Sequence, residues 1–130
     1  MYSLASGVSI SISNCDISCN ANRPVKATDI DPFLKEETTP AQAGAFFIQD
    51  ASTVTASNSV FHNCYQTSQG AIFYLKSTQP STIVTTLIDN GGTTYKDNQA
   101  KQGGVIFCDM CNLNLQSTLA NPILMTTNYA

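Results

Sequence analysis

Short runs of alternating apolar and small polar residues recur along the chain, and Asn, Gly, Asp or Ser residues separate them. The clearest runs cover residues 8–12, 45–48, 71–75 and 105–108. Such alternation is typical of half-buried β-strands, and the separating residue types favour turns. A helical apolar stripe is visible only within residues 27–37. The pattern therefore predicts an all-β chain of short strands.

The runs belong to an internal repeat. Residues 95–107 align with residues 61–73 at an offset of 34, and each copy reaches a glycine nine residues after an aromatic residue. Residues 10–17 align in the same way with residues 54–61, and the shortest repeating unit is 26 residues long. The recurring positions are Ile17, Phe61 and Tyr95; Gly44, Gly70 and Gly104; and Asn14 and Asn58.

A unit of this length has an apolar face that it cannot bury alone, whereas stacked units form a continuous core. We therefore expect about three to four stacked rungs, with neighbouring strands ~4.8 Å apart. The recurring aromatic and isoleucine positions should stack on one inner face. The recurring glycines should lie where a turn enters a strand, at a positive φ or a close backbone approach. Asn14 and Asn58 should form a ladder of side-chain amides.

Two motifs occur in the same order in each copy. They read Tyr95-Lys96-Asp97-Asn98 with Gly103-Gly104-Val105-Ile106, and Phe61-His62-Asn63-Cys64 with Gln69-Gly70-Ala71-Ile72. The pair resembles the Phe-x-x-Asn and Gly-Gly-Ala-Ile motifs of the polymorphic outer-membrane protein repeats and, more broadly, of right-handed parallel β-helices of the pectin-lyase-like type. The resemblance covers roughly residues 8–20 and 42–120, and it implies a right-handed parallel β-helix solenoid. The chain departs from the motifs in keeping only one Gly-Gly and in having Cys64 at the asparagine position.

Residues 20–41 differ from the rest of the chain. They hold seven of the 15 charged side chains and three of the five prolines. We interpret them as one long inserted loop, either a binding or packing arm or a solvated surface loop. Residues 1–130 are then a single β-helix domain or a fragment of a longer one. The first residues have no secretory signal pattern, and we favour the fragment.

The composition narrows the range of functions. Ser, Thr, Asn and Gln make up 47 of the 130 residues, whereas 12% are charged and the net charge is −3. Charge repulsion is therefore too weak to cause disorder, and no basic run is present to bind nucleic acid. No apolar stretch reaches the ~18 residues of a membrane span. Uncharged polar side chains do tolerate stacking at strand spacing, where like charges would repel.

The five cysteines stand at positions 15, 19, 64, 108 and 111, so at least one is unpaired within the chain. Cys19 and Cys64, at nearly matching repeat positions, are the expected disulfide if the protein is extracellular. Inert buried thiols are the alternative. A single CxxC and the sole histidine, His62, fall short of a zinc site. We expect no metal and no cofactor.

The carboxylates within the repeats are Asp50, Asp97 and Asp109, and Lys76 occupies the rung between Asp50 and Asp109. Glycoside hydrolysis usually needs two carboxylates about 5–10 Å apart, in adjacent rungs of a β-helix. Because Asp50 and Asp109 are two rungs apart, we assign no catalytic residue and expect no enzyme. We expect a structural or adhesive module on the cell surface or outside the cell, which stacks on itself as a fibre or continues into further repeats. The alternative is a β-helix that binds or degrades polysaccharide, with glycans as partners and Tyr65, Tyr74 or Tyr95 as stacking platforms.

Overall fold

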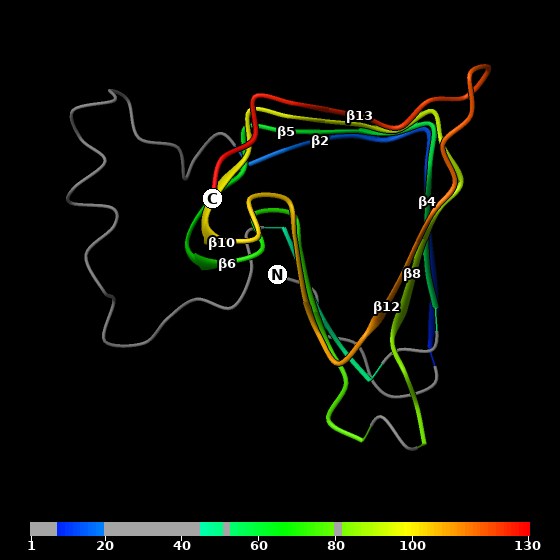
Figure 1. Ribbon diagram of the computed structural model, residues 1–130, viewed down its shortest axis with the longest axis vertical. Helices are drawn as coiled ribbons and strands as arrows, with labels where there is room; N and C mark the ends of the chain where they lie inside the picture. Colours follow the sequence, from blue (N-terminus) through cyan, green and yellow to red (C-terminus); the bar gives the residue numbers. More distant parts are fainter. Residues whose placement is uncertain (1–7, 20–44, 51–52, 80–81) are drawn as a thin grey trace.

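The computed structural model describes residues 8–19, 45–50, 53–79 and 82–130, without the side chains of residues 67 and 68 (Figure 1). Within these ranges the chain forms thirteen strands and no helix. Every pairing between named strands is parallel. These findings confirm the expectation of an all-β chain of short parallel strands. The expected insert at residues 20–41 lies outside the described residues.

The strands form four sheets, which we call A to D. Sheet A has the order β1 (Ser9–Ser13), β4 (Thr53–Ser57), β8 (Thr86–Asp89), β12 (Asn112–Leu115). Sheet B has the order β2 (Asp16–Ser18), β5 (Val60–His62), β9 (Thr94–Lys96), β13 (Leu124–Thr126). Sheet C has the order β3 (Phe46–Gln49), β7 (Phe73–Lys76), β11 (Ile106–Asp109). Sheet D pairs β6 (Tyr65–Gln69) with β10 (Gln99–Gln102).

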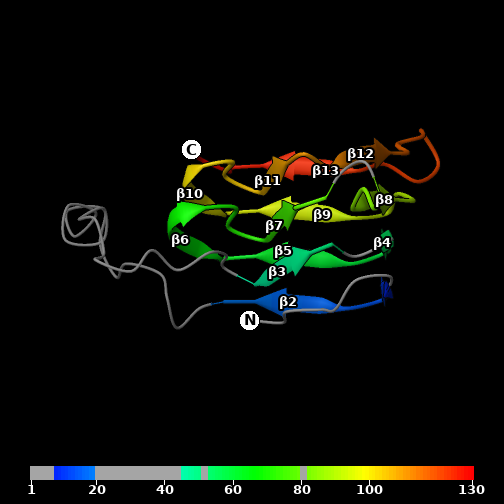
Figure 2. The ribbon, with the colours of Figure 1, turned by 90° about the horizontal axis from the view of Figure 1, so that it is seen from below.

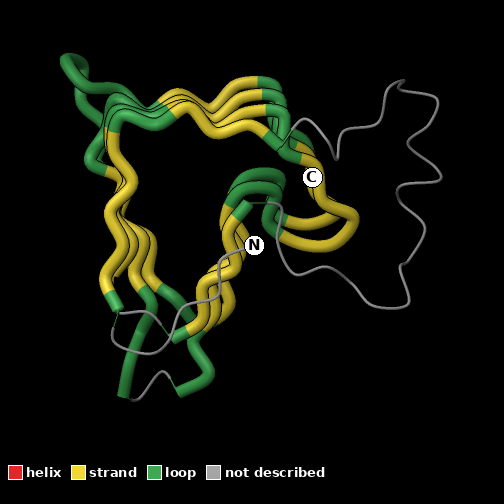
Figure 3. The backbone as a smooth tube through the Cα atoms, turned by 180° about the vertical axis from the view of Figure 1, so that it is seen from behind, coloured by secondary structure: helices red, strands yellow, loops and turns green. Residues whose placement is uncertain are grey.

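The chain visits the sheets in the repeated order A, B, D, C, and we call each such pass a rung. Strands β4 to β7 make the second rung and β8 to β11 the third. Figure 2 shows the rungs lying above one another, with β2 at one end and β12 and β13 at the other. The strands of each sheet overlap when the molecule is seen along the stacking direction (Figure 3).

Apolar side chains of successive rungs form continuous columns inside the sheets. In sheet A, Val54 and Leu87 are paired in register and fully buried. In sheet B, Ile17 is paired with Phe61 and Phe61 with Tyr95. The Phe61 and Tyr95 rings stack with centroids 5.2 Å apart and planes 9° from parallel. This spacing follows from the distance between neighbouring strands and is a favourable one for offset aromatic pairs.

Single residues with positive φ turn the chain at the corners between sheets. Asn14 and Asn58 do so between sheets A and B, and both have φ near 50°, at 54° and 46°. Asn63 and Asp97 do the same after β5 and β9, each with φ 54°. Asn and Asp tolerate this left-handed region better than other residues with a side chain. The Asn and Asp residues between the strand runs are therefore part of the corner geometry.

The alignment of the second motif is wrong by one residue. An offset of 34 matches Ile72 with Ile106, whereas the structure pairs Phe73 with Ile106 in sheet C. The cause is a β-bulge in sheet D, where the register shifts between Ala100 and Gln102. One additional residue in β6 shortens the offset from there on.

Because of the bulge, the glycine equivalent to Gly70 is Gly103 and not Gly104 as expected. Gly70 and Gly103 have φ of 65° and 61°, and a Cβ on either would collide with the carbonyl oxygen three residues later. Gly104 has a different reason: a Cβ there would collide with the backbone carbonyl of Tyr129, which crosses it in the fourth rung. Gly44 lies outside the described residues.

Candidate functional site

Among the described residues, the edges of sheets A and B are open at the C-terminal end of the stack, as is the edge of sheet C at β11. Strands β12 and β13 are the last strands of sheets A and B. The N–H groups of Asn112 and Gln116 donate to Thr85 and Asp89 of the preceding rung. Because the direction of backbone groups alternates along a strand, the N–H and C=O groups of Leu113 and Leu115 point the other way. They are free to pair with one more parallel strand.

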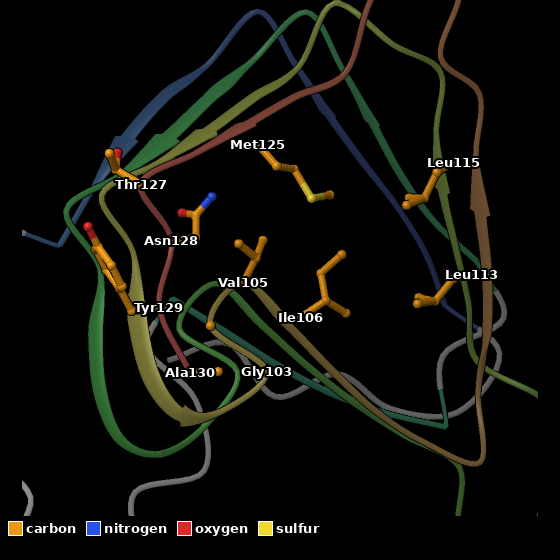
Figure 4. Close-up of a pocket in the computed structure, with 11 residues that line it drawn as sticks. Gly103, Val105, Ile106, Leu113, Leu115, Met125, Thr127, Asn128, Tyr129 and Ala130 are labelled. Atoms are coloured by element: carbon orange, nitrogen blue, oxygen red, sulfur yellow. The ribbon is translucent and has the colours of Figure 1, made fainter.

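An apolar hollow of about 480 Å³ lies at this end (Figure 4). Leu113, Leu115 and Met125 line it, and 45%, 43% and 48% of their surfaces are exposed. Leu113 is in register with Leu87, and Met125 with Tyr95, both fully buried one rung below. The exposed side chains therefore occupy core positions that no further rung covers in this structure.

The last rung carries no charge to protect these edges. From Met110 to Ala130 the sequence has no Asp, Glu, Lys, Arg or His. Natural sheet edges are commonly guarded by charged side chains, lysine above all, which discourage pairing with other chains. The open end therefore combines unpaired backbone groups, apolar side chains and an absence of charge.

Asparagines of the first motif connect the rungs through their side chains. The Asn98 side-chain oxygen accepts the Cys64 N–H at 3.0 Å, and its amide donates to the Phe61 carbonyl at 3.1 Å. Asn128 stands three residues after Met125, which is in register with Tyr95, and so occupies the same position one rung higher. It repeats the pattern with the Asn98 N–H at 3.1 Å and the Tyr95 carbonyl at 2.9 Å. Each motif asparagine thus reaches back to the preceding rung, and the ladder ends at Asn128.

The expected ladder between Asn14 and Asn58 is replaced by other contacts. The Asn14 side-chain amide donates to the Ser13 hydroxyl of its own rung at 3.1 Å, and that residue is exposed. The Asn58 side chain lies against Gly92, where a Cβ would collide with it. These two asparagines act through their backbone conformation, because a positive φ is what the corner requires.

Disulfides join Cys19 to Cys64 and Cys108 to Cys111, and Cys15 is a free, exposed thiol. The first disulfide links β2 to the second rung, at the position where Asn98 and Asn128 make their ladder bonds one and two rungs higher. A covalent bond between rungs therefore replaces the asparagine contact at Cys64. The second disulfide spans the corner between β11 and β12.

The three carboxylates considered for catalysis each have their own local partner. Asp109 lies 3.8 Å from the Lys76 ammonium. Asp50 accepts the Thr78 hydroxyl at 2.6 Å and the Thr78 N–H at 2.7 Å, and these bonds lower the pKa of its carboxyl group. Asp97 accepts the Thr127 hydroxyl at 2.6 Å. Asp50 and Asp109 lie at the same end of sheet C, two rungs apart with Lys76 in the rung between, whereas Asp97 lies at the corner after β9.

The tyrosines proposed as sugar platforms are unsuited to that role. Tyr65, Tyr74 and Tyr95 are all buried, and the Tyr74 ring lies between those of Phe47 and Phe107, with its centroid 5.2 Å from each. A stacking platform needs an exposed ring face, so this part of the polysaccharide-binding interpretation is wrong.

The side chain of His62 makes local contacts through both of its ring nitrogens. The His62 Nε2 lies 2.7 Å from the Asp16 carboxylate, and Nδ1 lies 2.7 Å from the Asn63 side-chain amide. Among the described residues, no three His, Cys, Asp or Glu side chains are grouped so that they could hold a metal ion. In the same residues, no helix has the length and apolar character needed to span a membrane.

A scan against protein-family models and searches of curated proteins and of solved structures found no match to this chain. On the geometry described above, the C-terminal end of the stack is the best-defined candidate site. Sequence reasoning had not singled out Leu113, Leu115 and Met125. Their signal is present in the sequence, since they are apolar residues at inward positions of the last copy of the repeat.

Proposed function

We propose that this chain is a non-catalytic structural or adhesive module, a right-handed parallel β-helix of the pectin-lyase-like type that acts at the cell surface or outside the cell. Its working part is the open C-terminal end, which extends the stack by pairing with further parallel rungs. The exposure of Leu113, Leu115 and Met125 at core positions carries this proposal.

Three observations support it. The repeated order of the sheets and the parallel pairing are those expected of a β-helix. Two disulfides are typical of proteins that work in oxidising compartments. The separate local partners of Asp50, Asp97 and Asp109 favour a structural role over glycan cleavage.

The non-catalytic part is tested by incubating the protein with pectin and related polysaccharides and measuring released reducing ends and unsaturated products. The double variant Asp50→Asn/Asp109→Asn is the matched control. We expect the same background signal from both proteins. Turnover by the unaltered protein that disappears in the double variant would overturn the proposal and favour a polysaccharide-degrading β-helix.

A further inference from the structure

We propose that the open C-terminal end pairs with the N-terminal end of a second copy of this chain. In this arrangement β1 of one copy adds to β12 of the other, and β2 adds to β13. The proposal rests on the proposed function, since it names the partner of the open end described above.

The two ends are opposite edges of the same sheets. Sheet A begins at β1 and ends at β12, and sheet B begins at β2 and ends at β13. Both sheets are parallel throughout. A second copy shifted along the stacking direction therefore presents strands of the correct direction to the edges at β12 and β13 at once (Figure 2).

The register already present in the molecule fixes which side chains would meet. Ile10 is in register with Val54, Val54 with Leu87, and Leu87 with Leu113. The next position in this column is Ile10 of the second copy. By the same rule Ile12 would cover Leu115, and Ile17 would cover Met125. Two apolar columns, those that end at Leu113 and Met125, would thus continue across the junction. The column of Ile12 and Leu115 is interrupted by the buried Asp89.

The backbone groups at the two edges also match. The Asn14 N–H donates to Ser57, so by alternation Ser9, Ser11 and Ser13 direct their N–H and C=O groups away from β4. Among the described residues no strand pairs with this side of β1, so these groups face outward at the N-terminal end, as those of Leu113 and Leu115 do at the C-terminal end. Parallel pairing would satisfy both sets.

Charge does not oppose the contact. Asp16 is the only charged residue in β1, β2, β12 and β13, the four strands that would pair, and its carboxylate already lies 2.7 Å from His62. The register places Leu124 of the neighbouring copy opposite Asp16, so no like charges meet. Because the contact joins different surfaces and repeats by translation, it does not close, and its product is a filament.

The test compares substitutions at the open C-terminal end with a control substitution in the neighbouring loop between β12 and β13. Leu113→Lys would bury an unpaired charge in the junction, and Met125→Lys does the same in sheet B. Leu119→Lys is the matched control, because Leu119 is fully exposed in the loop between β12 and β13. Ser11→Pro removes an outward N–H at the other end, where an edge strand tolerates proline. Sedimentation velocity and electron microscopy measure assembly over a range of concentrations, and circular dichroism checks folding.

We expect the unaltered protein and Leu119→Lys to form linear assemblies that lengthen with concentration. Leu113→Lys and Met125→Lys should weaken the contact by at least about 100-fold. A mixture of Leu113→Lys and Ser11→Pro should stop at dimers, because each variant keeps one functional end. Should Leu113→Lys fail to fold, Met125→Lys supplies the same test.

A monodisperse monomer at all concentrations would overturn the proposal and would leave a further rung of a longer chain, or a different protein, as the occupant. Equal assembly by Leu113→Lys, Met125→Lys and Leu119→Lys would also overturn it, as would mixed assemblies longer than dimers. The polysaccharide assay is independent of all these results, so a failure of this inference is distinguishable from a failure of the proposed function.

Discussion

The side-chain amide of Asn98 donates to the side-chain oxygen of Asn128 at 2.9 Å, and so joins two successive rungs. Asn98 is fully buried, and its side chain also satisfies the Cys64 N–H and the Phe61 carbonyl. One side chain therefore serves backbone groups that the strand pairing leaves unsatisfied at this corner.

Replacing Asn98 with Ala should lower the free energy of unfolding by about 3 kcal/mol, because it leaves buried backbone groups without partners. Urea unfolding followed by circular dichroism measures the change. Asn114→Ala is the control, since Asn114 is exposed in β12 and should change stability by less than about 0.5 kcal/mol. Equal effects of the two substitutions would contradict the structural role of Asn98.

The Tyr95 hydroxyl donates a hydrogen bond to the buried Asp89 carboxylate at 2.8 Å, and we expect this bond to stabilise the folded protein. Tyr95→Phe removes this donor and should cost about 1–3 kcal/mol of stability. Tyr129→Phe alters an exposed tyrosine of the next rung and should be neutral. Thermal melting of the two variants beside the unaltered protein measures the difference.

The same hydroxyl gives the protein a sensitivity to alkali. Burial, and then the nearby Asp89, raise the pKa of Tyr95 above its ordinary value. The unfolded chain then loses this proton near pH 10 while the folded chain keeps it, so the contribution of Tyr95 to stability is constant below about pH 10 and is lost above it. Urea midpoints at pH 9 and pH 11 should differ less for Tyr95→Phe than for the unaltered protein. An equal drop in both would assign the alkaline loss to other groups.

Thr127 is a β-branched residue with φ 52°, a conformation that such residues rarely adopt. Asn63 and Asp97 hold the equivalent corners, so Thr127→Asn should stabilise the protein by about 0.5–1 kcal/mol, because relief of the strain outweighs the loss of the exposed hydroxyl bond to Asp97. Thr126→Asn, one residue earlier in β13, has no such strain to relieve and is the control. A rise in melting temperature for Thr127→Asn alone is the expected result.

The disulfide between Cys19 and Cys64 closes a segment of 45 residues. Its removal should lower stability by about 2–4 kcal/mol, because the unfolded chain regains freedom. The double variant Cys19→Ser/Cys64→Ser and the control Cys15→Ser, which alters the free thiol, are compared by chemical unfolding under non-reducing conditions. Mass spectrometry of peptides from the unreduced protein should show the Cys19–Cys64 link, and its absence would contradict this prediction.

The alternating pattern and the repeat were sufficient to predict short strands in stacked copies, because apolar residues that recur at a fixed spacing can be buried only by stacking the copies. The parallel direction of the strands was implied by the family resemblance. The exact equivalence of Gly70 and Gly104 was not predictable in this way. A bulge adds a residue inside a polar strand, where no apolar residue marks the shift.

The candidate site was only partly predictable. The sequence indicated that the two ends of the stack are open. It did not indicate that Met125 is exposed, because this depends on β13 being the last strand of sheet B. The asparagine ladder was expected at Asn14 and Asn58, whose side chains contact Ser13 and the Gly92 position instead. The ladder forms instead at Asn98 and Asn128, where the motif places an amide three residues after an inward side chain.

The parallel pairing has a consequence for the speed of folding. Phe46 finds its partner in Phe73, and Ile10 finds its partner in Val54, so no strand pairs with the one that follows it in the chain. The chain must close long loops, and lose conformational entropy, before any of these pairings can form and stabilise it. The protein should therefore fold slowly, with a nucleus that already contains strands from two rungs, and should expose unpaired edges for much of its folding time.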